Sequence, residues 1–330
     1  MDEIFNRATS KESASKVTCM ILSKDISVVV QGPIHKQDNL TKRVLESVRT
    51  HLPDAELILS TWKGSEVDGL DCDVLLLNED PGPLLKQPVN SRNLNRQIIS
   101  TRNGILVSKC DFVLKLRTDC LLSGVGFVPF FEKFPNRNPK YSIFSNRIIT
   151  ITHFSRNPRY SHYLFHPSDI TQFGKKEDML LNWDISPLNP EDEHTFMPEP
   201  YIFIECLKKV GNLPHLYNQK FSFRRFKYSE NYLINNFIIL EPKVYGIILS
   251  DSLKQHRNIG LYSQKDWERL YEYYSVNQKE TPDFYSFFQA INTRVLFRLT
   301  AFSERFRLSK SSPKTTRNAH SQSSRVLEKS

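Results

Sequence analysis

Residues 26–34 read Ile-Ser-Val-Val-Val-Gln-Gly-Pro-Ile, and this stretch decides the fold class. Residues 26–30 form a β-branched run with a single serine, which predicts a strand buried on both faces. The strand ends at Gly32 and Pro33, and the apolar stripe of residues 41–51 predicts a helix directly after it. A buried strand, a glycine-proline turn and a helix form the opening unit of an α/β domain.

Strands and helices continue to alternate beyond this unit. The further predicted elements are, in chain order, strands at 56–60 and 73–77, a helix at 93–108, strands at 112–116 and 141–152, a helix at 200–210 and a strand at 244–249. Polar loops at the carboxyl ends of such strands are typical of a Rossmann-like nucleotide-binding sheet. The sequence therefore predicts an α/β fold with a mixed sheet flanked by helices.

Four segments differ in composition. Residues 1–24 are polar and predicted to be flexible, and residues 25–275 hold the α/β domain. Residues 276–308 predict an amphipathic helix, and residues 309–330 a disordered basic tail. The apolar stripe of that helix either packs against the domain, which we favour because core-facing helices are commoner, or lies on an anionic membrane. The stripe consists of Phe284, Phe287, Phe288, Ile291, Val295, Leu296, Leu299 and Phe302.

The chain is basic, with 45 Lys and Arg against 36 Asp and Glu and a net charge of +9. Such an excess suits a polyanionic partner: a nucleic acid, an anionic membrane, a phosphorylated glycan or a nucleotide. Residues 303–330 hold seven of the cations against two Glu, so more than half of the excess lies in the tail. No nucleic-acid-binding motif accompanies it, which argues against specific nucleic-acid recognition.

Cysteine usage and hydropathy indicate the compartment. The five cysteines are scattered without a CxxC pair, which argues against a zinc ribbon or a disulfide framework. The first residues hold no apolar run that resembles a signal sequence, and no stretch of about 18 apolar residues is long enough to span a membrane. We therefore expect a cytoplasmic protein, with peripheral contact at the inner face of the plasma membrane if the amphipathic helix binds lipid.

The run Leu-Lys-Leu-Arg-Thr-Asp at residues 114–119 carries the chemistry of the predicted site. Side chains alternate along a strand, so Lys115, Arg117 and Asp119 tend toward one side. Two cations and a carboxylate at a strand end suit a diphosphate leaving group, with Mg²⁺ or Mn²⁺ held by the carboxylate. The alternative is an ion pair between Arg117 and Asp119 that only stabilises the strand end.

Other polar residues lie where predicted strands end or along the helix at 93–108. Ligands of open α/β sheets bind at the carboxyl ends of the strands, so these residues are candidates for nucleotide contacts. The amide of Gln31 suits a hydrogen bond to a base, and Trp62 suits stacking on a base or sugar unless it is a core residue. The set comprises Gln31, Gly32, Pro33, Ser60, Thr61, Trp62, Arg96, Gln97 and Arg102, beside Lys115 and Arg117.

Five runs of this chain, in order and spacing, resemble the WavE family of lipopolysaccharide-synthesis proteins. They are ISVVVQGPI at 26–34, PDAELILSTWKG at 53–64, NEDPG at 78–82, NRQIISTRNGI at 95–105 and LKLRTD at 114–119. The resemblance implies a GT-A-like glycosyltransferase that moves a sugar from a nucleotide-sugar to lipopolysaccharide or another surface glycan, which can be lipid-linked. It also adds Asp80, in the third run, to the candidate donor-binding residues.

The same resemblance implies roles for charged residues. Asp119 matches the metal-binding aspartate of GT-A enzymes, and His256 is the candidate for a further ligand to Mn²⁺ or Mg²⁺. The usual Asp-any-Asp signature is replaced by Arg117, Thr118 and Asp119, so Arg117 could supply part of the charge of the metal. An inverting enzyme needs a general base toward the acceptor hydroxyl, and the candidates are Asp169, Asp178 and Glu199.

Two other functions are open from the sequence. A nucleotidyltransferase that makes activated sugars uses a similar sheet, but it normally has a glycine-rich phosphate loop after the first strand. Residues 31–37 read QGPIHKQ and hold one glycine, which makes this function the weaker one. The other is a non-catalytic protein that binds polyanions or acts as a scaffold.

Overall fold

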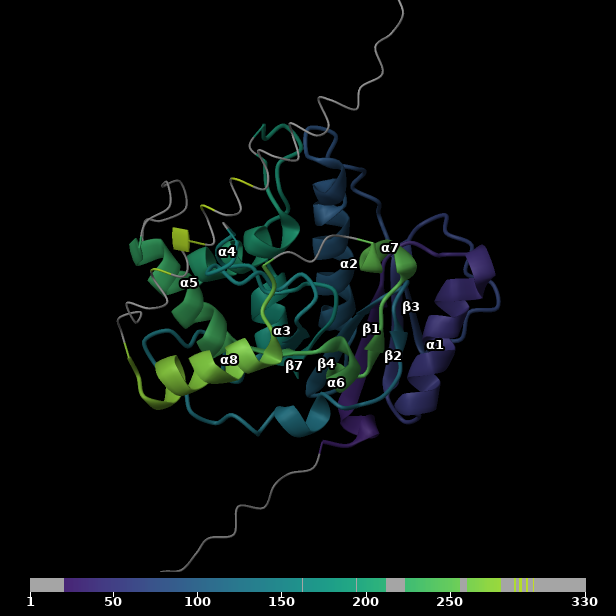
Figure 1. The fold of residues 1–330 in the computed structure, drawn as a ribbon. Coiled ribbons are helices and arrows are strands. Elements are labelled where there is room, and N and C mark those ends of the chain that lie inside the picture. Colours follow the sequence, from purple (N-terminus) through teal and green to yellow (C-terminus); the bar gives the residue numbers. More distant parts are fainter. Residues whose placement is uncertain are drawn as a thin grey trace, which may run out of the picture.

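The computed structural model describes residues 21–161, 163–193, 195–211, 223–255 and 260–279, together with the helical positions Phe288, Ile291, Asn292, Val295 and Leu299. A central sheet runs through the molecule, and helices pack around it (Figure 1). The expectations for residues 1–20, for His256 and for the tail 309–330 lie outside the described residues.

The first half of the chain alternates strands and helices as predicted. Its elements are β1 (Ile26–Gln31), α1 (Leu40–His51), β2 (Glu56–Trp62), β3 (Val74–Asn78), α2 (Leu94–Val107), β4 (Phe112–Arg117) and the short β5 (Leu121–Leu122). These bounds differ by at most two residues from those predicted for the strands and helices up to residue 117. Short apolar runs for the strands and periodic apolar residues for the two helices were sufficient to place them.

The second half is built from shorter elements. They are β6 (Ile148–Ile151), β7 (Gln172–Lys175), α3 (Lys176–Trp183), α4 (Pro198–Lys209), α5 (Phe223–Asn236), β8 (Phe237–Leu240), α6 (Pro242–Tyr245), β9 (Ile247–Ile248), α7 (Asp251–Lys254) and α8 (Gln264–Tyr271). A π-helical turn at Glu272–Val276 continues α8. A buried ion pair of 2.5 Å between Arg159 and Glu230 ties α5 to the loop after β6.

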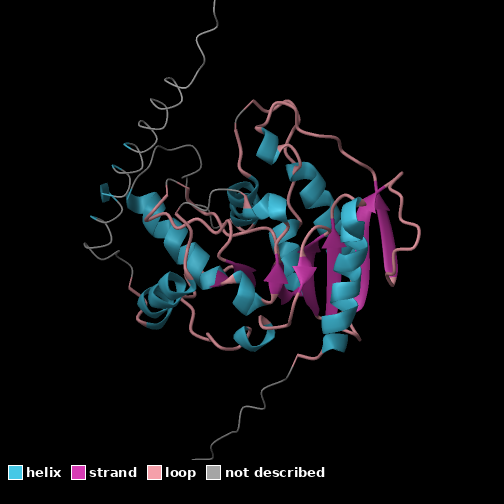
Figure 2. Ribbon diagram, turned by 45° about the vertical axis from the view of Figure 1, so that its right-hand side comes forward, coloured by secondary structure: helices cyan, strands magenta, loops and turns pink. Residues whose placement is uncertain are grey.

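In the described part of the chain, seven strands form one mixed sheet in the order β3-β2-β1-β4-β7-β6-β8 (Figure 2). Strands β3, β2, β1 and β4 are parallel, and β7 runs antiparallel to β4 and β6. The chain adds β2 and β3 on one side of β1 and then returns to add β4 on the other. The carboxyl ends of β1 and β4 therefore form a topological switch point, where open α/β sheets bind ligands.

Helices α1 and α2 cover opposite faces of the parallel half. The two crossovers that contain them run in opposite directions across the sheet, and right-handed crossovers then place their helices on opposite faces. Helix α1 stands in front of the strands in Figure 2. Gly104 lets α2 approach β1 closely, because a Cβ there would lie 2.3 Å from Cγ1 of Val29. Every residue of β1 is buried, as predicted for a strand covered on both faces.

The two strands predicted in the second half are present but shorter than predicted. The strand predicted at 141–152 is limited to Ile148–Ile151, because side chains rather than a sheet partner satisfy the preceding backbone amides. Asn236 accepts from the amide of residue 143, and Asp178 from those of residues 145 and 146. The strand that completes the sheet is β8, whereas the region 244–249 holds only β9, which pairs with β5.

The amphipathic segment near the C-terminus does not show the packing against the domain that we favoured. Ile291, Val295 and Leu299 are 39%, 52% and 60% exposed, so the apolar stripe is not packed against the domain at these positions. Among the described residues no helix combines the length and the apolar character needed to cross a membrane.

Candidate functional site

A cavity of about 400 Å³ opens at the switch point, within the usual size range of small-molecule sites. Its walls come from the loops after β1, β2, β3 and β4, from the start of α2 and from α7. The lining residues are Gln31, Gly32, Pro33, His35, Trp62, Asp80, Asn93, Arg96, Gln97, Arg117, Thr118, Asp119 and Ser252. Gly32, with φ +128°, brings the first loop against the fourth, because a Cβ would lie 2.8 Å from the hydroxyl of Thr118.

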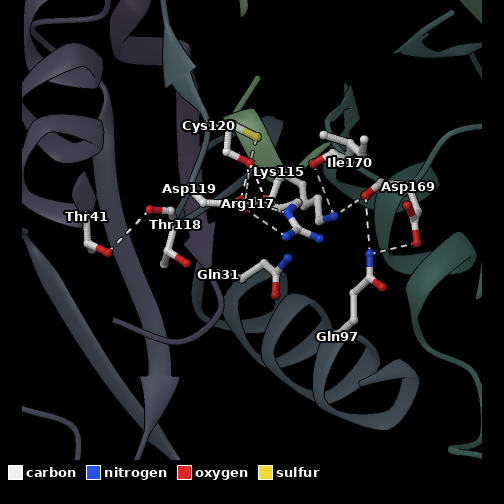
Figure 3. A network of polar contacts seen from close by, with 12 residues as sticks. Gln31, Thr41, Gln97, Lys115, Arg117, Thr118, Asp119, Cys120, Asp169 and Ile170 are labelled. Carbon is white, nitrogen blue, oxygen red and sulfur yellow. Dashed lines mark hydrogen bonds and ion pairs between the residues drawn. The ribbon is translucent and has the colours of Figure 1, made fainter. Parts of the chain in front are cut away.

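Arg117 and Asp119 form one edge of the cavity. Nε and Nη2 of Arg117 donate to the two carboxylate oxygens of Asp119 over 2.8 and 2.9 Å, and Ser250 donates to Oδ2 over 3.0 Å (Figure 3). Burial raises the pKa of Asp119, but the hydrogen bonds and charge of Arg117 outweigh it, and the pKa falls to about 2. Asp119 is therefore ionised, and the ion pair that the sequence left open is present.

A second arginine–aspartate pair lies in the cavity wall. Nε and Nη2 of Arg96 donate to the two oxygens of Asp80 over 2.7 and 2.6 Å, and Nη1 donates to Asn93 over 3.0 Å. The same carboxylate accepts from the backbone amide of Gly82 over 2.9 Å. Because Asp80 follows β3 and Arg96 lies in the first turns of α2, this pair fixes the loop between them.

Gln31 is held in a defined orientation at the end of β1. Its Oε1 accepts from Ser100 of α2 over 2.8 Å, so its Nε2 is the end left for a ligand. Among the hydrogen bonds of the described residues, none uses that Nε2. Ser60 and Asn78 continue the network behind it: Ser60 donates to the carbonyl of Ser100, and Asn78 donates to Ser60.

Lys115 is fully buried behind the cavity and does not line it. Its Nζ donates to the backbone carbonyls of Asp169 and Ile170, and it lies 5.0 Å from the ring centre of Trp183. Burial lowers the pKa of Lys115 to about 8, although the charge of Asp169 opposes that shift. Lys115 thus holds the loop of residues 169–170 against β4 (Figure 3).

Asp169 contacts the cavity wall through a hydrogen bond from Gln97. The Nε2 of Gln97, which lines the cavity, donates to Oδ2 of Asp169 over 2.8 Å. Glu199, at the start of α4, is buried, and its Oε2 lies 3.7 Å from Nε2 of His166. Burial and the charge of Asp169 raise the pKa of Glu199 well above its usual value, while Arg156 and Lys115 oppose the rise. A buried carboxyl group with a raised pKa, close to a second carboxyl group beside a cavity, is a candidate for acid–base chemistry.

The structure gathers most of the predicted residues at this site. Trp62 lines the cavity but is 8% exposed, which leaves little of its ring face open. Ser60, Thr61 and Lys115 lie behind the wall, and Arg102 is also absent from the lining. Asp178 bonds to residues 145 and 146 instead of facing the cavity.

Sequence reasoning missed several lining residues. His35 closely follows the turn at Gly32, and Asn93 and Thr118 adjoin predicted residues. Closeness in sequence to the predicted motifs could therefore have identified these three residues. Ser252 lies in α7 and the Asp119 partner Ser250 directly precedes that helix, more than 130 residues beyond β4. Nothing in the local pattern around them indicates that contact.

A divalent metal does not fit the residues described at this site. Each of the two carboxylates among the described lining residues, Asp80 and Asp119, is already bound by an arginine through both oxygens. The described residues also contain no group of three His, Cys, Asp or Glu side chains placed to hold a metal ion. A cation bound here would have to replace an arginine at one of these two carboxylates.

Comparison with known proteins identifies the family. No curated protein sequence matches this chain significantly. The sequence model of the family described as WavE lipopolysaccharide synthesis matches residues 26–301. That range includes the whole sheet, the cavity and the amphipathic segment up to Leu299. The chain therefore belongs to the WavE family, which connects it with lipopolysaccharide synthesis.

Proposed function

We propose that the protein is a glycosyltransferase with a GT-A-like fold that transfers a sugar from a nucleotide-sugar to lipopolysaccharide or a related surface glycan. The observation that carries the proposal is the cavity at the switch point, whose polar walls come from the ends of four parallel strands. Such a position is where nucleotides bind in open α/β sheets. The family supplies the glycan context.

The proposal orients the donor by the polar and aromatic residues of the cavity wall. Gln31 and Trp62, at the ends of β1 and β2, lie where a base would be recognised by a hydrogen bond and an apolar contact. Arg117, at the end of β4, lies where the phosphate would be held. A guanidinium that keeps its charge stabilises the negative charge that develops on the leaving nucleotide.

The acceptor would approach from the side of Gln97 and Asp169. The Asp169 carboxylate would take the proton of the acceptor hydroxyl as that oxygen bonds to the anomeric carbon and the bond from that carbon to the phosphate oxygen breaks. The nucleotide then leaves with the electron pair of the broken bond. This sequence inverts the anomeric centre.

The amphipathic segment near the C-terminus supports a location at the membrane. Ile291, Val295 and Leu299 expose one apolar stripe, and the same segment carries Arg294 and Arg298 before the basic tail. An apolar face beside cations suits an anionic lipid surface. We therefore propose that the enzyme works at the cytoplasmic face of the inner membrane, where a lipid-linked acceptor would be presented.

Donor binding is tested by thermal shift of the full chain with UDP-, GDP-, CMP- and dTDP-sugars, each with Mn²⁺, with Mg²⁺ or with EDTA. A ligand at about 100 times its Kd stabilises a folded protein by about 2.7 kcal/mol, which is a measurable rise in Tm. We expect one nucleotide class to raise Tm. A panel in which none does would contradict a preformed donor site.

A further inference from the structure

We infer that the donor phosphate is bound by the guanidinium of Arg117 without a divalent cation, and that Asp119 is a positioning residue for Arg117 rather than a metal ligand. This inference rests on the proposed function and specifies how the same cavity handles charge. It explains why an arginine and an aspartate lie two residues apart at the end of β4, pointing into one site (Figure 3).

The hydrogen bonds of Asp119 leave it little capacity to bind a metal. A carboxylate offers about four lone-pair positions. Oδ1 accepts from Nε of Arg117 and lies 3.7 Å from the thiol of Cys120, while Oδ2 accepts from Nη2 of Arg117 and from Ser250. A metal ion at this carboxylate would have to displace a charged partner and would then lie beside a guanidinium.

The second carboxylate of the described wall gives no better site. Asp80 accepts from Arg96 at both oxygens and from the amide of Gly82 at Oδ1. Magnesium demands near-octahedral oxygen ligands, and calcium takes six to eight. A metal ion at Asp80 would therefore also have to displace an arginine from a carboxylate whose two oxygens are both in use.

Arg117 has the features that phosphate binding requires. Two of its nitrogens are held by Asp119, and in the described part of the chain no group accepts a hydrogen bond from the third, Nη1. Its side chain is 34% exposed, in contrast with the 6% of Asp119 beneath it. A guanidinium fixed on one edge by a carboxylate presents its other N–H groups in a set direction, which suits a phosphate oxygen.

Ser250 extends the arrangement to α7. Ser250 directly precedes α7 and its hydroxyl donates to Oδ2 of Asp119, while Ser252 within α7 lines the cavity. The orientation of Arg117 therefore depends on a chain segment that is distant in sequence. Loss of the Ser250 hydroxyl should loosen Asp119 and, through it, Arg117, while the charges of the site stay unchanged.

The test has two parts, and both use the full chain. In the first, Mn²⁺ is titrated against the protein alone and free Mn²⁺ is followed by electron paramagnetic resonance. In the second, calorimetry measures the Kd of UDP, GDP, CMP and dTDP, first with EDTA and then with Mn²⁺. We expect the wild type and Asp119→Asn to bind Mn²⁺ to the same extent. We also expect the nucleotide Kd measured with EDTA and the Kd measured with Mn²⁺ to agree within about twofold.

Variants separate positioning from metal binding. Arg117→Lys keeps the charge but loses the planar fork, and should weaken nucleotide binding about tenfold or more in both buffers. Asp119→Asn should weaken it equally in both buffers, and Ser250→Ala to a smaller extent. The matched control is Asp73→Asn, because Asp73 forms a similar two-oxygen pair with Arg49 away from the cavity. That change should leave the nucleotide Kd unaltered.

The outcomes are distinct. Nucleotide binding that EDTA abolishes, or an Mn²⁺ site lost in Asp119→Asn, would overturn the metal-free site and leave the proposed glycosyl transfer in place. If no nucleotide binds in either buffer, the proposed function fails and the inference fails with it. Should Asp119→Asn fail to fold, the comparison of buffers with the wild type and with Arg117→Lys still decides.

Discussion

Nε2 of Gln97 lies 2.8 Å from Oδ2 of Asp169, and this hydrogen bond joins the wall of the cavity to the loop before β7. Gln97 lies in α2, which packs on the parallel half of the sheet. Asp169 lies just before β7, which runs antiparallel to its neighbours β4 and β6. The backbone carbonyl of Asp169 is held by the buried Lys115. The carboxylate is thus fixed from two sides at the border between the donor cavity and the rest of the domain.

Asp169→Asn should lower kcat by about 10²- to 10⁴-fold, the usual contribution of a general base. Nucleotide Kd should stay within a few-fold, because Asn can still accept from Gln97. The control is Asp178→Asn, which removes an acceptor of loop amides and should lower Tm while kcat is kept. An Asp169→Asn enzyme with near-normal kcat would remove Asp169 from the mechanism.

Glu199→Gln should change how stability depends on pH. The folded state raises the pKa of Glu199 above the 4.5 of the free side chain, so the unfolded chain loses this proton first. The stability contribution is then fully present below pH 4.5 and is lost as pH rises toward the folded pKa. Because Gln carries no charge, the Tm of the variant relative to wild type should rise from pH 5 to pH 8, roughly the range in which this linkage acts.

That comparison is made by thermal unfolding of both proteins in one set of buffers. The groups that act on Glu199 are Asp169, Arg156 and Lys115, with His166 at 3.7 Å. A Tm difference that stays constant over the range, or that shrinks with rising pH, would show that Glu199 is ionised in the folded protein.

Gly104→Ala should destabilise the fold although alanine is the better helix former. Helix propensity favours the change by about 1 kcal/mol, but the new methyl would meet Val29 in β1. Overpacking of this kind costs about 1–3 kcal/mol. Chemical denaturation should give a lower free energy of unfolding, and adding Val29→Ala should recover part of it. Additive losses in the double variant would mean that the two residues do not meet.

The exposed apolar stripe should bind membranes. The full chain should float with vesicles that contain anionic lipid and be released as salt is raised, since charge attraction is screened. The pair of substitutions Val295→Asp and Leu299→Asp should abolish flotation. Leu106→Asp is the matched control, because Leu106 is 51% exposed on α2. Equal loss with the control would indicate a general effect of added negative charge.

The parallel half of the sheet could be predicted because its strands are short apolar runs that end at Gly, Pro or polar residues. β1 is buried on both faces, whereas β3 leaves Leu75 and Leu77 exposed. β8 escaped prediction because its apolar run follows α5 with no turn residue between them. The extra length given to β6 covered residues 143–146, whose amides are satisfied by the side chains of Asn236 and Asp178. Local periodicity holds no information on such long-range side-chain partners.

In the candidate site, too, the local sequence predicts some features, while others depend on long-range side-chain contacts. Gln31, Asp80, Arg117 and Asp119 could be placed together because the carboxyl ends of parallel strands meet at one edge. The hydrogen-bond partners of Asp119 could not be predicted, since one of them is Ser250, which lies 131 residues further along the chain. The sequence left open a metal ligand and an ion pair, and the side-chain geometry shows the ion pair with Arg117.

The most direct test of glycosyl transfer uses the donor that the thermal-shift panel selects, labelled with ¹⁴C in its sugar. The full chain is incubated with this donor and a lipopolysaccharide extract, and label in the glycan is counted beside released nucleotide. We predict incorporation that matches nucleotide release and falls with Asp169→Asn but not with Asp178→Asn. Donor binding without transfer of label, or release of pyrophosphate from a nucleoside triphosphate and sugar phosphate, would contradict the proposed function.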